Sequence, residues 1–483
     1  NIDNIQDNPK AKSQANPKSQ DNPKAKYRSN NISNWLTQEK KIDTSMLSPE
    51  QQLAFDKYRE GENIFITGPG GCGKTKLIQL IAKHANINRQ RCKVCAMTGC
   101  AAVLLGLKAK TFHSWGGFGL ANDSIEKIVD RIMKSPMKKK NWVNTDVLIV
   151  DEVSMMSSKL FELFYIISRR IRNPNLLFGG IQVIFSGDFY QLPPIDDDFC
   201  FINKNWEGSF KPIVLSKIFR QDNIDWINIL NQVREGYMTK KSYKLLKTRV
   251  NKPLSDNNMV PTRILPRRFS VDNINNREMK KITGDDMVYE LSLPSPDNLS
   301  SKDKELSNSF SADQKIAEME SMKTNMVCLD KLVLKIGCQV LCICNLDMDS
   351  DNQICNGSQG IVVGFCDGGP DVVTNNKLPL VQFNNGEKRI IDYHTWRSEV
   401  IPEVGIMQLP LILSWAITIH RAQGLTLESA ELDIGDNIFE KGQTYVSLSR
   451  VKDIEGVYLT HFNPTKIQVD LRVKDFYEKI KME

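Results

Sequence analysis

NIFITGPGGCGKTKLIQLIA, residues 63–82, decides the fold. Its apolar beginning predicts a short buried strand, and its end carries apolar residues at the spacing of one helix face. Between them, GPGGCGKT has the G-x-x-x-x-G-K-T spacing of a phosphate-binding loop, whose glycines are Gly68, Gly70, Gly71 and Gly73. Such glycines let backbone N–H groups surround phosphates, while Lys74 reaches the β and γ oxygens and Thr75 can ligate Mg²⁺. The flanking strand and helix disfavour a chance glycine-rich turn.

Other apolar runs extend this pattern along the chain. Residues 92–97, 146–150 and 181–185 predict strands, and 157–172 predicts a helix between two of them. Strands that alternate with helices imply a parallel sheet covered on both faces. A second alternation begins near residue 213, and strand-rich segments with Asn-Gly turns interrupt it between 333 and 396.

We therefore expect several domains. They are a disordered polar tail at 1–40, a first lobe at 41–212 with an insertion at about 116–145, a second lobe at 213–285 and 405–483, and an inserted β-barrel at 286–404. The Ser-, Asp- and Lys-rich segment 294–324 is predicted to be a mobile surface excursion.

Polar residues follow two of the predicted strands. Asp151 and Glu152 come after a buried run, where the first can hold Mg²⁺ and the second can take a proton from an attacking water. Gln191 follows the strand at 181–185 and precedes two prolines. Because the carboxyl ends of parallel strands converge, its amide would lie beside the γ-phosphate. Arg220 and Arg450, in the second α/β unit, are candidates for the positive charge that hydrolysis requires.

Composition excludes several other classes of protein. The chain is 41% hydrophobic and 25% charged with a net charge of +7, which permits an acidic partner without requiring one. Its eleven cysteines include no CxxC pair with a matching second pair, which argues against zinc and favours a reduced, intracellular setting. The apolar stretch at 411–419 is far too short to span a bilayer, so no membrane partner is expected.

Ordered motifs from about 47 to 460 resemble the PIF-type (petite integration frequency) DNA helicases of superfamily one, which are close to RecD-like enzymes. The motifs are LSPEQ (47–51), GPGGCGKT (68–75), MTGCAA (97–102), TFHSWGG (111–117), VDEVSMM (150–156), GDFYQLPP (187–194), FRQ (219–221), LKIGCQV (334–340), NGSQGIVVGF (356–365), SWAITIHRAQGLTL (414–427) and YVSLSR (445–450). The segment 161–184 is similar to the one that sets this group apart.

The resemblance implies an α/β fold with two RecA-like P-loop lobes, a small wedge insertion in the first and a Src-homology-3-like barrel in the second. It implies an ATP-dependent DNA helicase that uses ATP and Mg²⁺ and moves 5′→3′. The implied partners are single-stranded DNA and forked or overhang duplexes, with G-quadruplexes and RNA–DNA hybrids as further candidates. The implied setting is replication, repair, recombination or telomere maintenance. A monomer is expected, located in the nucleus or mitochondrion if the source is eukaryotic, or in a host cell if it is viral.

The resemblance also assigns roles to residues. Gln51 would read adenine, Gly424 would line the nucleotide site, and Gln191 would sense the γ-phosphate. Arg220 and Arg450 would act as arginine fingers, and Thr75 and Asp151 would hold the metal. The residues implied to lie along single-stranded DNA are Thr98, Gly99, Thr111, His113 and His420.

Some features remain open. Arg267 and Arg268 stand where the family usually carries an asparagine, a change that suits phosphate contacts. Base stacking is one interpretation of three aromatic residues, and burial in a core is the other; these are Trp115, Phe118 and Trp415. The lysines at 134 and 138–140 fit either a wedge or a solvated turn.

The same residues discriminate among rival functions. A guanine-nucleotide switch would need an Asn-Lys-x-Asp element, which the chain lacks. A metabolite kinase would not need the acidic pair together with two distant arginines. A translocase acting on RNA or RNA–DNA hybrids, or a non-unwinding DNA-binding scaffold, remains an alternative, since 2′-OH contacts cannot be recognised in this sequence.

Overall fold

The computed structural model describes most of the chain after its polar beginning. The described residues are 42–107, 109–118, 123–195, 197–253, 260–295, 299–325, 328, 330–344, 346, 354, 356–367, 377–398 and 401–482. The predicted disordered tail at 1–40 lies outside them. None of the helices in these ranges has the length and apolar character that crossing a membrane requires.

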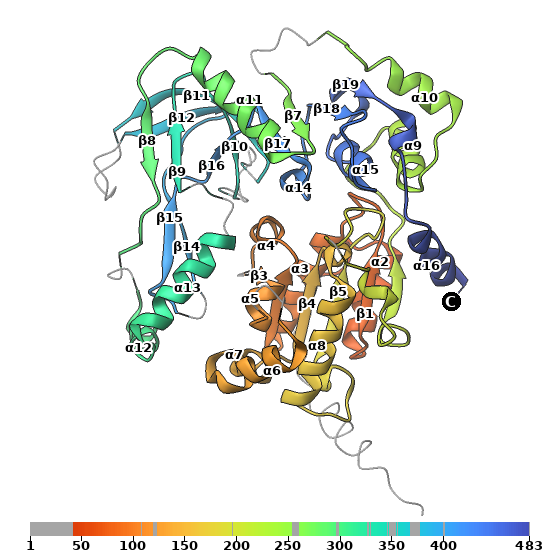
Figure 1. Ribbon diagram of the computed structural model, residues 1–483, viewed down its shortest axis with the longest axis vertical. Helices are drawn as coiled ribbons and strands as arrows, with labels where there is room; N and C mark the ends of the chain where they lie inside the picture. The colour runs from red at the N-terminus through yellow and green to blue at the C-terminus, as the bar shows by residue number, and fades with distance from the viewer. Residues whose placement is uncertain are drawn as a thin grey trace, which may run out of the picture. The chain divides into compact units, whose positions relative to one another are not determined.

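The first lobe is built on a parallel sheet with the strand order β3-β2-β4-β5-β1-β6 (Figure 1). Its strands are β1 (Ile64–Thr67), β2 (Cys92–Ala96), β3 (Lys110–Thr111), β4 (Val147–Asp151), β5 (Gln182–Ser186) and β6 (Lys211–Val214). Its helices are α2 (Pro49–Arg59), α3 (Lys74–Ile87), α4 (Gly99–Leu105), α5 (Phe112–Gly116), α6 (Ile125–Lys134), α7 (Pro136–Val143) and α8 (Ser158–Ile171). The strands predicted at 92–97, 146–150 and 181–185 are confirmed to within about a residue.

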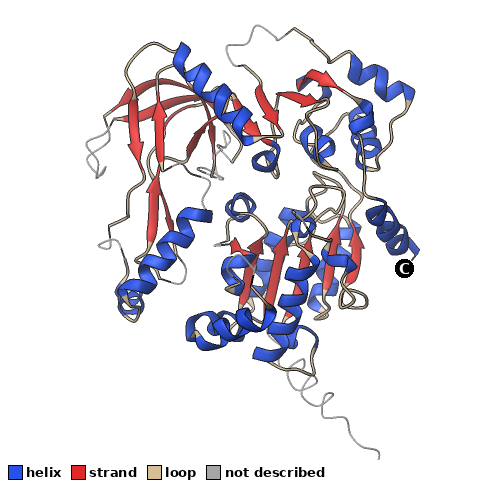
Figure 2. Ribbon diagram, in the orientation of Figure 1, coloured by secondary structure: helices blue, strands red, loops and turns tan. Residues whose placement is uncertain are grey.

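Both faces of this sheet are buried, because successive side chains of a strand point to opposite faces. In β1, Phe65 joins one hydrophobic core, whereas Ile64 and Ile66 join the other. β4 divides in the same way, with Leu148 and Ile149 on opposite faces. Helices lie along the sheet in Figure 2. A strand enclosed in this way must be apolar along its whole length, which is the pattern seen in the sequence.

The second lobe has a smaller parallel sheet with the order β17-β7-β18-β19. Its strands are β7 (Thr262–Leu265), β17 (Ala416–Thr418), β18 (Ala430–Ile434) and β19 (Val457–Phe462). Its helices are α9 (Ile224–Arg234), α10 (Lys240–Lys247), α11 (Arg268–Lys281), α14 (Ile419–Ala422) and α15 (Gln443–Leu448). The expected α/β class with two parallel sheets is confirmed.

An antiparallel region interrupts the second lobe in sequence. Its five-stranded sheet runs β13-β12-β11-β10-β16, and two-stranded ladders pair β8 with β9 and β14 with β15. The strands are β8 (Met287–Glu290), β9 (Lys331–Leu334), β10 (Gln339–Cys342), β11 (Gln359–Cys366), β12 (Leu378–Phe383), β13 (Lys388–Ile390), β14 (His394–Arg397), β15 (Gly405–Gln408) and β16 (Leu411–Leu413). Because β15 and β16 pair within this region, it extends past the boundary expected at 404.

Two stretches in this part of the chain have a structure that their composition did not indicate. The segment 294–324, predicted to be a mobile excursion, contains helices α12 (Ser301–Asn308) and α13 (Ala312–Asn325). The apolar stretch 411–419 is divided between β16 of the antiparallel sheet, β17 of the parallel sheet and the start of α14. A change of sheet inside one apolar run leaves no mark in hydrophobicity alone.

The C-terminal helix α16 (Leu471–Met482) returns to the first lobe, although the second lobe was expected to extend to residue 483. Its side chains Val473 and Tyr477 are buried in the same core as Phe65, and Figure 1 shows the helix in dark blue beside β1. The tyrosine hydroxyl lies 2.6 Å from Thr67 Oγ1, at the end of β1. The helix therefore packs against β1, the strand that leads into the phosphate-binding loop.

A buried ion pair joins the two lobes beside this helix. Arg234 of α9 donates through Nε and a terminal nitrogen to the two carboxylate oxygens of Asp188, at 2.9 and 2.8 Å. The Tyr477 hydroxyl donates to the same carboxylate at 3.3 Å and accepts from the Phe189 N–H at 3.1 Å. The guanidinium also lies 4.4 Å from the centroid of the Tyr190 ring. Asp188 is fully buried, so its charge depends on these partners.

Replacing Arg234 with Met should lower the free energy of unfolding by about 3–5 kcal/mol, because it leaves a buried carboxylate without its counter-charge. The matched control is Lys241→Met, which removes one side of the exposed Lys241–Asp225 pair at 2.8 Å and should cost under about 1 kcal/mol. Urea unfolding followed by circular dichroism measures both. Equal losses in the two variants would contradict a structural role for the buried pair.

Candidate nucleotide and nucleic-acid sites

The phosphate-binding loop connects β1 to α3 and depends on left-handed backbone. Gly71 and Gly73 have φ of 86° and 83°, a region that L side chains rarely adopt. At Gly71, a Cβ would also lie 2.6 Å from Cβ of Arg220. At Gly68, a Cβ would lie 2.3 Å from the Leu215 carbonyl oxygen. Only glycine therefore fits where the loop passes closest to its neighbours.

Lys74 begins α3 and turns its ammonium group back into the loop. Nζ donates to the carbonyl oxygens of Gly68 at 2.6 Å and Pro69 at 3.0 Å. The ammonium is thus held above the N-terminus of α3, which attracts anions. Phosphate oxygens would replace these carbonyl oxygens as its partners.

Acidic side chains lie at the end of β4. Asp151 accepts a hydrogen bond of 2.7 Å from the Ser186 hydroxyl, and Glu152 has a left-handed backbone with φ 57°. Burial and the like charge of Asp151 raise the pKa of Glu152 to about 7. Burial likewise raises the pKa of Asp151. A carboxyl group of this kind is suited to accept a proton near neutral pH.

The residues near Lys74 fit a magnesium ion that has few protein ligands. Thr75 at the start of α3 and Asp151 offer hydroxyl and carboxylate oxygens, the donors that Mg²⁺ prefers. Within the described ranges, no group of three or more His, Cys, Asp or Glu residues could hold a metal. A magnesium ion here would therefore complete its shell with phosphate oxygens and water, as Mg²⁺ commonly does.

A glutamine from the second lobe reaches both first-lobe residues expected to act on the γ-phosphate. Gln423 Nε2 donates to Glu152 Oε2 at 2.9 Å and to Gln191 Oε1 at 3.4 Å. The next residue, Gly424, has φ 83°, so the chain turns here in a way that favours glycine. The structure thus brings Gln191 and Glu152 together through a residue that sequence reasoning did not single out.

Two arginines of the second lobe lie at the phosphate-binding loop. Arg220 donates to the Ser449 carbonyl oxygen at 3.0 Å. Arg450 donates to the Val446 carbonyl oxygen at 3.0 Å and to the Ser449 hydroxyl at 2.8 Å. A Cβ built on Gly70 would lie 3.5 Å from a terminal nitrogen of Arg450. Burial, and then the like charge of Arg220, lowers the pKa of Arg450 to about 9. Two cations in this position, of which Arg450 is buried and Arg220 is partly exposed, favour an anion between them.

Tyr445 closes the loop from the second lobe, because its hydroxyl accepts from the Gly70 N–H at 2.8 Å. On the opposite side of the loop, Gln51 completes a capping box with Ser48 at the start of α2 and donates to the Cys72 carbonyl oxygen at 3.4 Å. The half-exposed ring of Phe219 lies beside Gly73, as Gln51 does. Amide and aromatic groups thus flank the loop where a base would be bound.

The predicted DNA contacts of the first lobe lie at the carboxyl ends of β2 and β3. Thr98 and Thr111 use their hydroxyl oxygens as helix N-caps, accepting from the Ala101 N–H at 3.2 Å and the Ser114 N–H at 3.2 Å. A capping hydroxyl keeps its own proton, which can be donated to a phosphate. Gly99 begins α4 and His113 lies in α5. His420 of the second lobe occupies the matching position after β17.

Of the two interpretations of the three aromatic residues, burial in a core is confirmed for Trp115 and Phe118. Trp115 and Phe118 are 2% and 0% exposed and belong to the first-lobe core. Trp415 is partly buried and packs against the core of the antiparallel sheet. The lysines at 134 and 138–140 lie on α6 and α7 rather than on a turn. Burial also lowers the pKa of Lys138.

Sequence reasoning missed three contributors to these sites. Gln423 precedes a glycine, and Tyr445 lies five residues before Arg450, but neither pattern marks a contact with the other lobe. The pairing of Asp188 with Arg234 left no local signal either. Each contact crosses between lobes, so it depends on tertiary structure alone.

Comparisons with known proteins agree with this arrangement. The family model described as PIF1-like helicase matches residues 46–244, and that of the DNA helicase Pif1 2B domain matches residues 319–365. The ATP-dependent DNA helicase Pif1 of Bdellovibrio bacteriovorus is 32% identical, over 90% of this chain and 92% of that protein. The ATP-dependent DNA helicase PIF1 of Emericella nidulans is 31% identical over 87% of this chain, but the match spans only 61% of that relative's length.

Solved structures give the same result. The crystal structure of Pif1 helicase from Candida albicans has 31% identity and a TM-score of 0.71, covering 90% of this chain and 99% of that chain. A Bacteroides Pif1 in complex with ADP-AlF4 has 25% identity and a TM-score of 0.71, covering 90% of this chain and 97% of that one. Fold, motif order and near-complete coverage agree, and this chain belongs to the PIF1-like helicase family.

Proposed function

We propose that this chain is an ATP-dependent DNA helicase that moves 5′→3′ along single-stranded DNA and separates duplex DNA. One observation carries the proposal: Arg220 and Arg450 lie at the same loop as Lys74, where Gln423 also contacts Glu152 and Gln191. Groups from two lobes that meet at one phosphate site can convert hydrolysis into relative movement. The proposed direction comes from the family.

In the proposed mechanism, each group has one task. Backbone N–H groups of the loop and Lys74 hold the β and γ phosphates, and Gln51 contacts the adenine. Thr75 and Asp151 would hold Mg²⁺, which when bound neutralises charge on the phosphates. Glu152, with its raised pKa, accepts the proton of the attacking water. The guanidinium groups of Arg220 and Arg450 stabilise the charge that develops on the transferred phosphoryl group.

Nucleotide binding would rearrange the contacts between the lobes. The Gly70 N–H now bonded to Tyr445 would turn to a phosphate oxygen, and Glu152 would exchange Gln423 for water. Gln423 lies three residues after His420 on the same short segment, so a change at the γ-phosphate would displace a predicted DNA contact. This is the proposed link between hydrolysis and stepping.

The proposed track runs along the carboxyl edges of both sheets, past Thr98 and Thr111 on the first lobe and His420 on the second. Single-stranded DNA and forked or overhang duplexes are the proposed substrates. Action on G-quadruplexes or RNA–DNA hybrids, a monomeric state, and a nuclear or mitochondrial location remain predictions. So does the alternative of a nucleic-acid-stimulated ATPase that acts on RNA.

Strand displacement on paired substrates tests the function directly. With Mg-ATP, the protein should unwind a duplex that carries a 5′ single-stranded overhang and not the same duplex with a 3′ overhang. Single-stranded DNA should stimulate its ATP hydrolysis, and Lys74→Ala should abolish both activities without unfolding the chain. Hydrolysis that DNA does not stimulate would favour a non-unwinding scaffold, and preference for an RNA track would favour the RNA-directed alternative.

Removing the guanidinium of Arg450 should affect catalysis far more than nucleotide binding. For Arg450→Ala, we expect kcat for ATP hydrolysis to fall by about 10³–10⁵-fold, because a positive charge is lost at the transition state. The affinity for a non-hydrolysable ATP analogue should change little. Arg277→Ala, which removes an exposed arginine of the same lobe paired with Glu278, is the control and should retain wild-type kcat. Circular dichroism checks that both variants are folded.

Replacing Gln191 with Ala should separate hydrolysis from movement. The variant loses the amide that contacts Gln423 of the second lobe, while Lys74, Glu152 and both arginines remain. DNA-stimulated hydrolysis should persist at a reduced rate, and strand displacement per ATP hydrolysed should fall. The two rates are measured on the same 5′-overhang substrate, and an unchanged ratio would refute the coupling role.

A further inference from the structure

Three loops that carry basic and aromatic residues meet at the carboxyl edge of the second-lobe sheet. β17, β7 and β18 are parallel neighbours, with Thr418 opposite Leu265 and Leu432 opposite Ile264. The residues that follow these strands therefore emerge at the same edge. They are Arg267 to Phe269 after β7, His420 and Arg421 after β17, and Phe439 to Lys441 after β18.

Two of these loops are in contact through an arginine and an aromatic ring. The Arg267 guanidinium carbon lies 5.7 Å from the centroid of the Phe439 ring, within the range of a cation–π interaction. The Phe439 ring is nonetheless 57% exposed, and Phe269 on the first turn of α11 is 77% exposed. We call Arg267, Phe269 and Phe439 the second-lobe platform. Large exposed rings beside cations mark a binding surface rather than a core.

Hydrogen bonds and core packing fix the loop that carries Phe439. The buried side chain of Gln443 accepts through Oε1 from the N–H groups of Phe439, at 3.3 Å, and Glu440, at 3.4 Å. Ile438 next to it is buried in the second-lobe core. The loop is thus fixed on both sides of the exposed ring, so that stacking on it would require little ordering. A rigid ring is a low-entropy contact surface.

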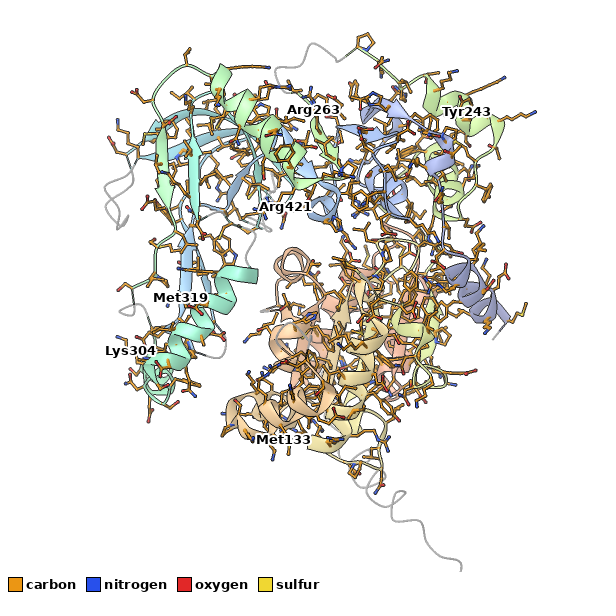
Figure 3. The ribbon with its side chains drawn as sticks, viewed as in Figure 1. Met133, Tyr243, Arg263, Lys304, Met319 and Arg421 are labelled. Carbon is orange, nitrogen blue, oxygen red and sulfur yellow. The ribbon has the colours of Figure 1, made fainter. Side chains whose placement is uncertain are left out.

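Charges around the platform favour a polyanion. Neither Arg267 nor Arg421 has a carboxylate within ion-pair distance among the residues that the structure describes. Arg421 is labelled in Figure 3, at α14. Two neighbouring cations have acidic partners: Arg268 lies 3.7 Å from Asp272, and Lys441 lies 3.3 Å from Asp470. Two further acidic side chains lie on the loop after β18. Asp436 accepts a hydrogen bond of 2.6 Å from the Asn463 side-chain amide, and the charge of Glu440 acts on His420. Arg267 therefore borders an exposed ring without an acidic partner, and Arg421 follows the neighbouring strand at the same edge of the sheet.

We propose that the second-lobe platform binds single-stranded nucleic acid, with one base stacked on Phe439 and with Arg267 and Arg421 on the adjacent phosphates. The occupant is single-stranded because a base offers its ring face only when it is unpaired. A protein partner would not explain why arginines without acidic partners share this edge of the sheet with exposed aromatic rings. The proposal deepens the proposed function and rests on it, since it specifies how the second lobe grips its track.

The resemblance described above leads us to expect an asparagine where this chain has Arg267 and Arg268. An asparagine can bond a phosphate or a base edge, but it cannot form a cation–π contact with Phe439 or contribute charge. The grip of this chain would accordingly depend more on ionic strength than a grip made by an amide. The salt dependence of DNA binding therefore allows the contribution of the platform to be measured separately from that of the other proposed DNA contacts.

Equilibrium binding of a fluorescein-labelled oligothymidylate, without nucleotide and over a series of salt concentrations, tests the proposal. Phe439→Ala and Phe439→Leu should each weaken binding about tenfold, because a stacked base is lost, whereas Phe439→Trp should retain wild-type affinity. Arg267→Ala should reduce the slope of log affinity against log salt by about 0.7, the contribution of one phosphate contact on a single strand.

Lys247→Ala is the matched control. Lys247 lies 5.8 Å from the centroid of the Tyr243 ring on α10, a similar cation–ring pair in the same lobe, and Figure 3 shows Tyr243 well apart from Arg421. This variant should leave both affinity and slope unchanged. Urea midpoints verify that all variants are folded.

The possible outcomes distinguish failure of the platform proposal from failure of the proposed helicase function. If the wild-type chain binds the oligonucleotide and shows DNA-stimulated hydrolysis, but Phe439→Ala and Arg267→Ala bind equally well, the platform is overturned and the helicase function stands. If Phe439→Leu keeps full affinity, base stacking is overturned. If the wild-type chain neither binds nor responds to DNA, the proposed function itself fails, and this inference fails with it.

Discussion

The buried pair of Asp188 and Arg234 is the constraint on which the arrangement of the two lobes depends. A carboxylate with no solvent exposure must keep its counter-charge, so α9 of the second lobe is held at the start of the loop that leads to Gln191. Tyr477 joins the same carboxylate to Thr67, at the end of the strand that precedes the phosphate-binding loop. One cluster thus anchors both phosphate-contacting loops and the second lobe.

Around the phosphate site the contacts have a different character, because they are polar and exchangeable. Tyr445 holds a loop N–H and Gln423 holds Glu152, the proposed catalytic carboxylate, through single hydrogen bonds that are worth only about 1 kcal/mol each. Arg220 and Arg450 are brought together against their mutual repulsion. A polyphosphate would relieve that repulsion and replace those hydrogen bonds. The Asp188–Arg234 pair thus holds the lobes together strongly, whereas the hydrogen bonds of Tyr445 and Gln423 close the phosphate site only weakly. A cycle of closing and opening requires this difference.

The carboxyl edges of the two sheets form the proposed surface for single-stranded DNA. On the first lobe, Thr98 and Thr111 cap helices with an oxygen and still retain a donor proton. On the second lobe, Arg267 and Phe439 provide a charge and a ring face. Hydroxyl groups and one cation–ring pair suit a motor, because each contact is individually weak enough to be released as the strand advances.

The sequence alone determined what short-range chemistry can encode. The glycine spacing before Lys74, the apolar run that ends at Asp151 and the proline stop after Gln191 each act within a few residues, so strands, loops and the phosphate site could be predicted from them. Tertiary structure decided which distant groups meet. Nothing near Tyr445 or Gln423 in sequence indicates a partner in the other lobe, because that contact depends on how two independently formed sheets pack. For the same reason, only the folded chain shows that Trp115 is enclosed by its core while Phe439 is left open to solvent.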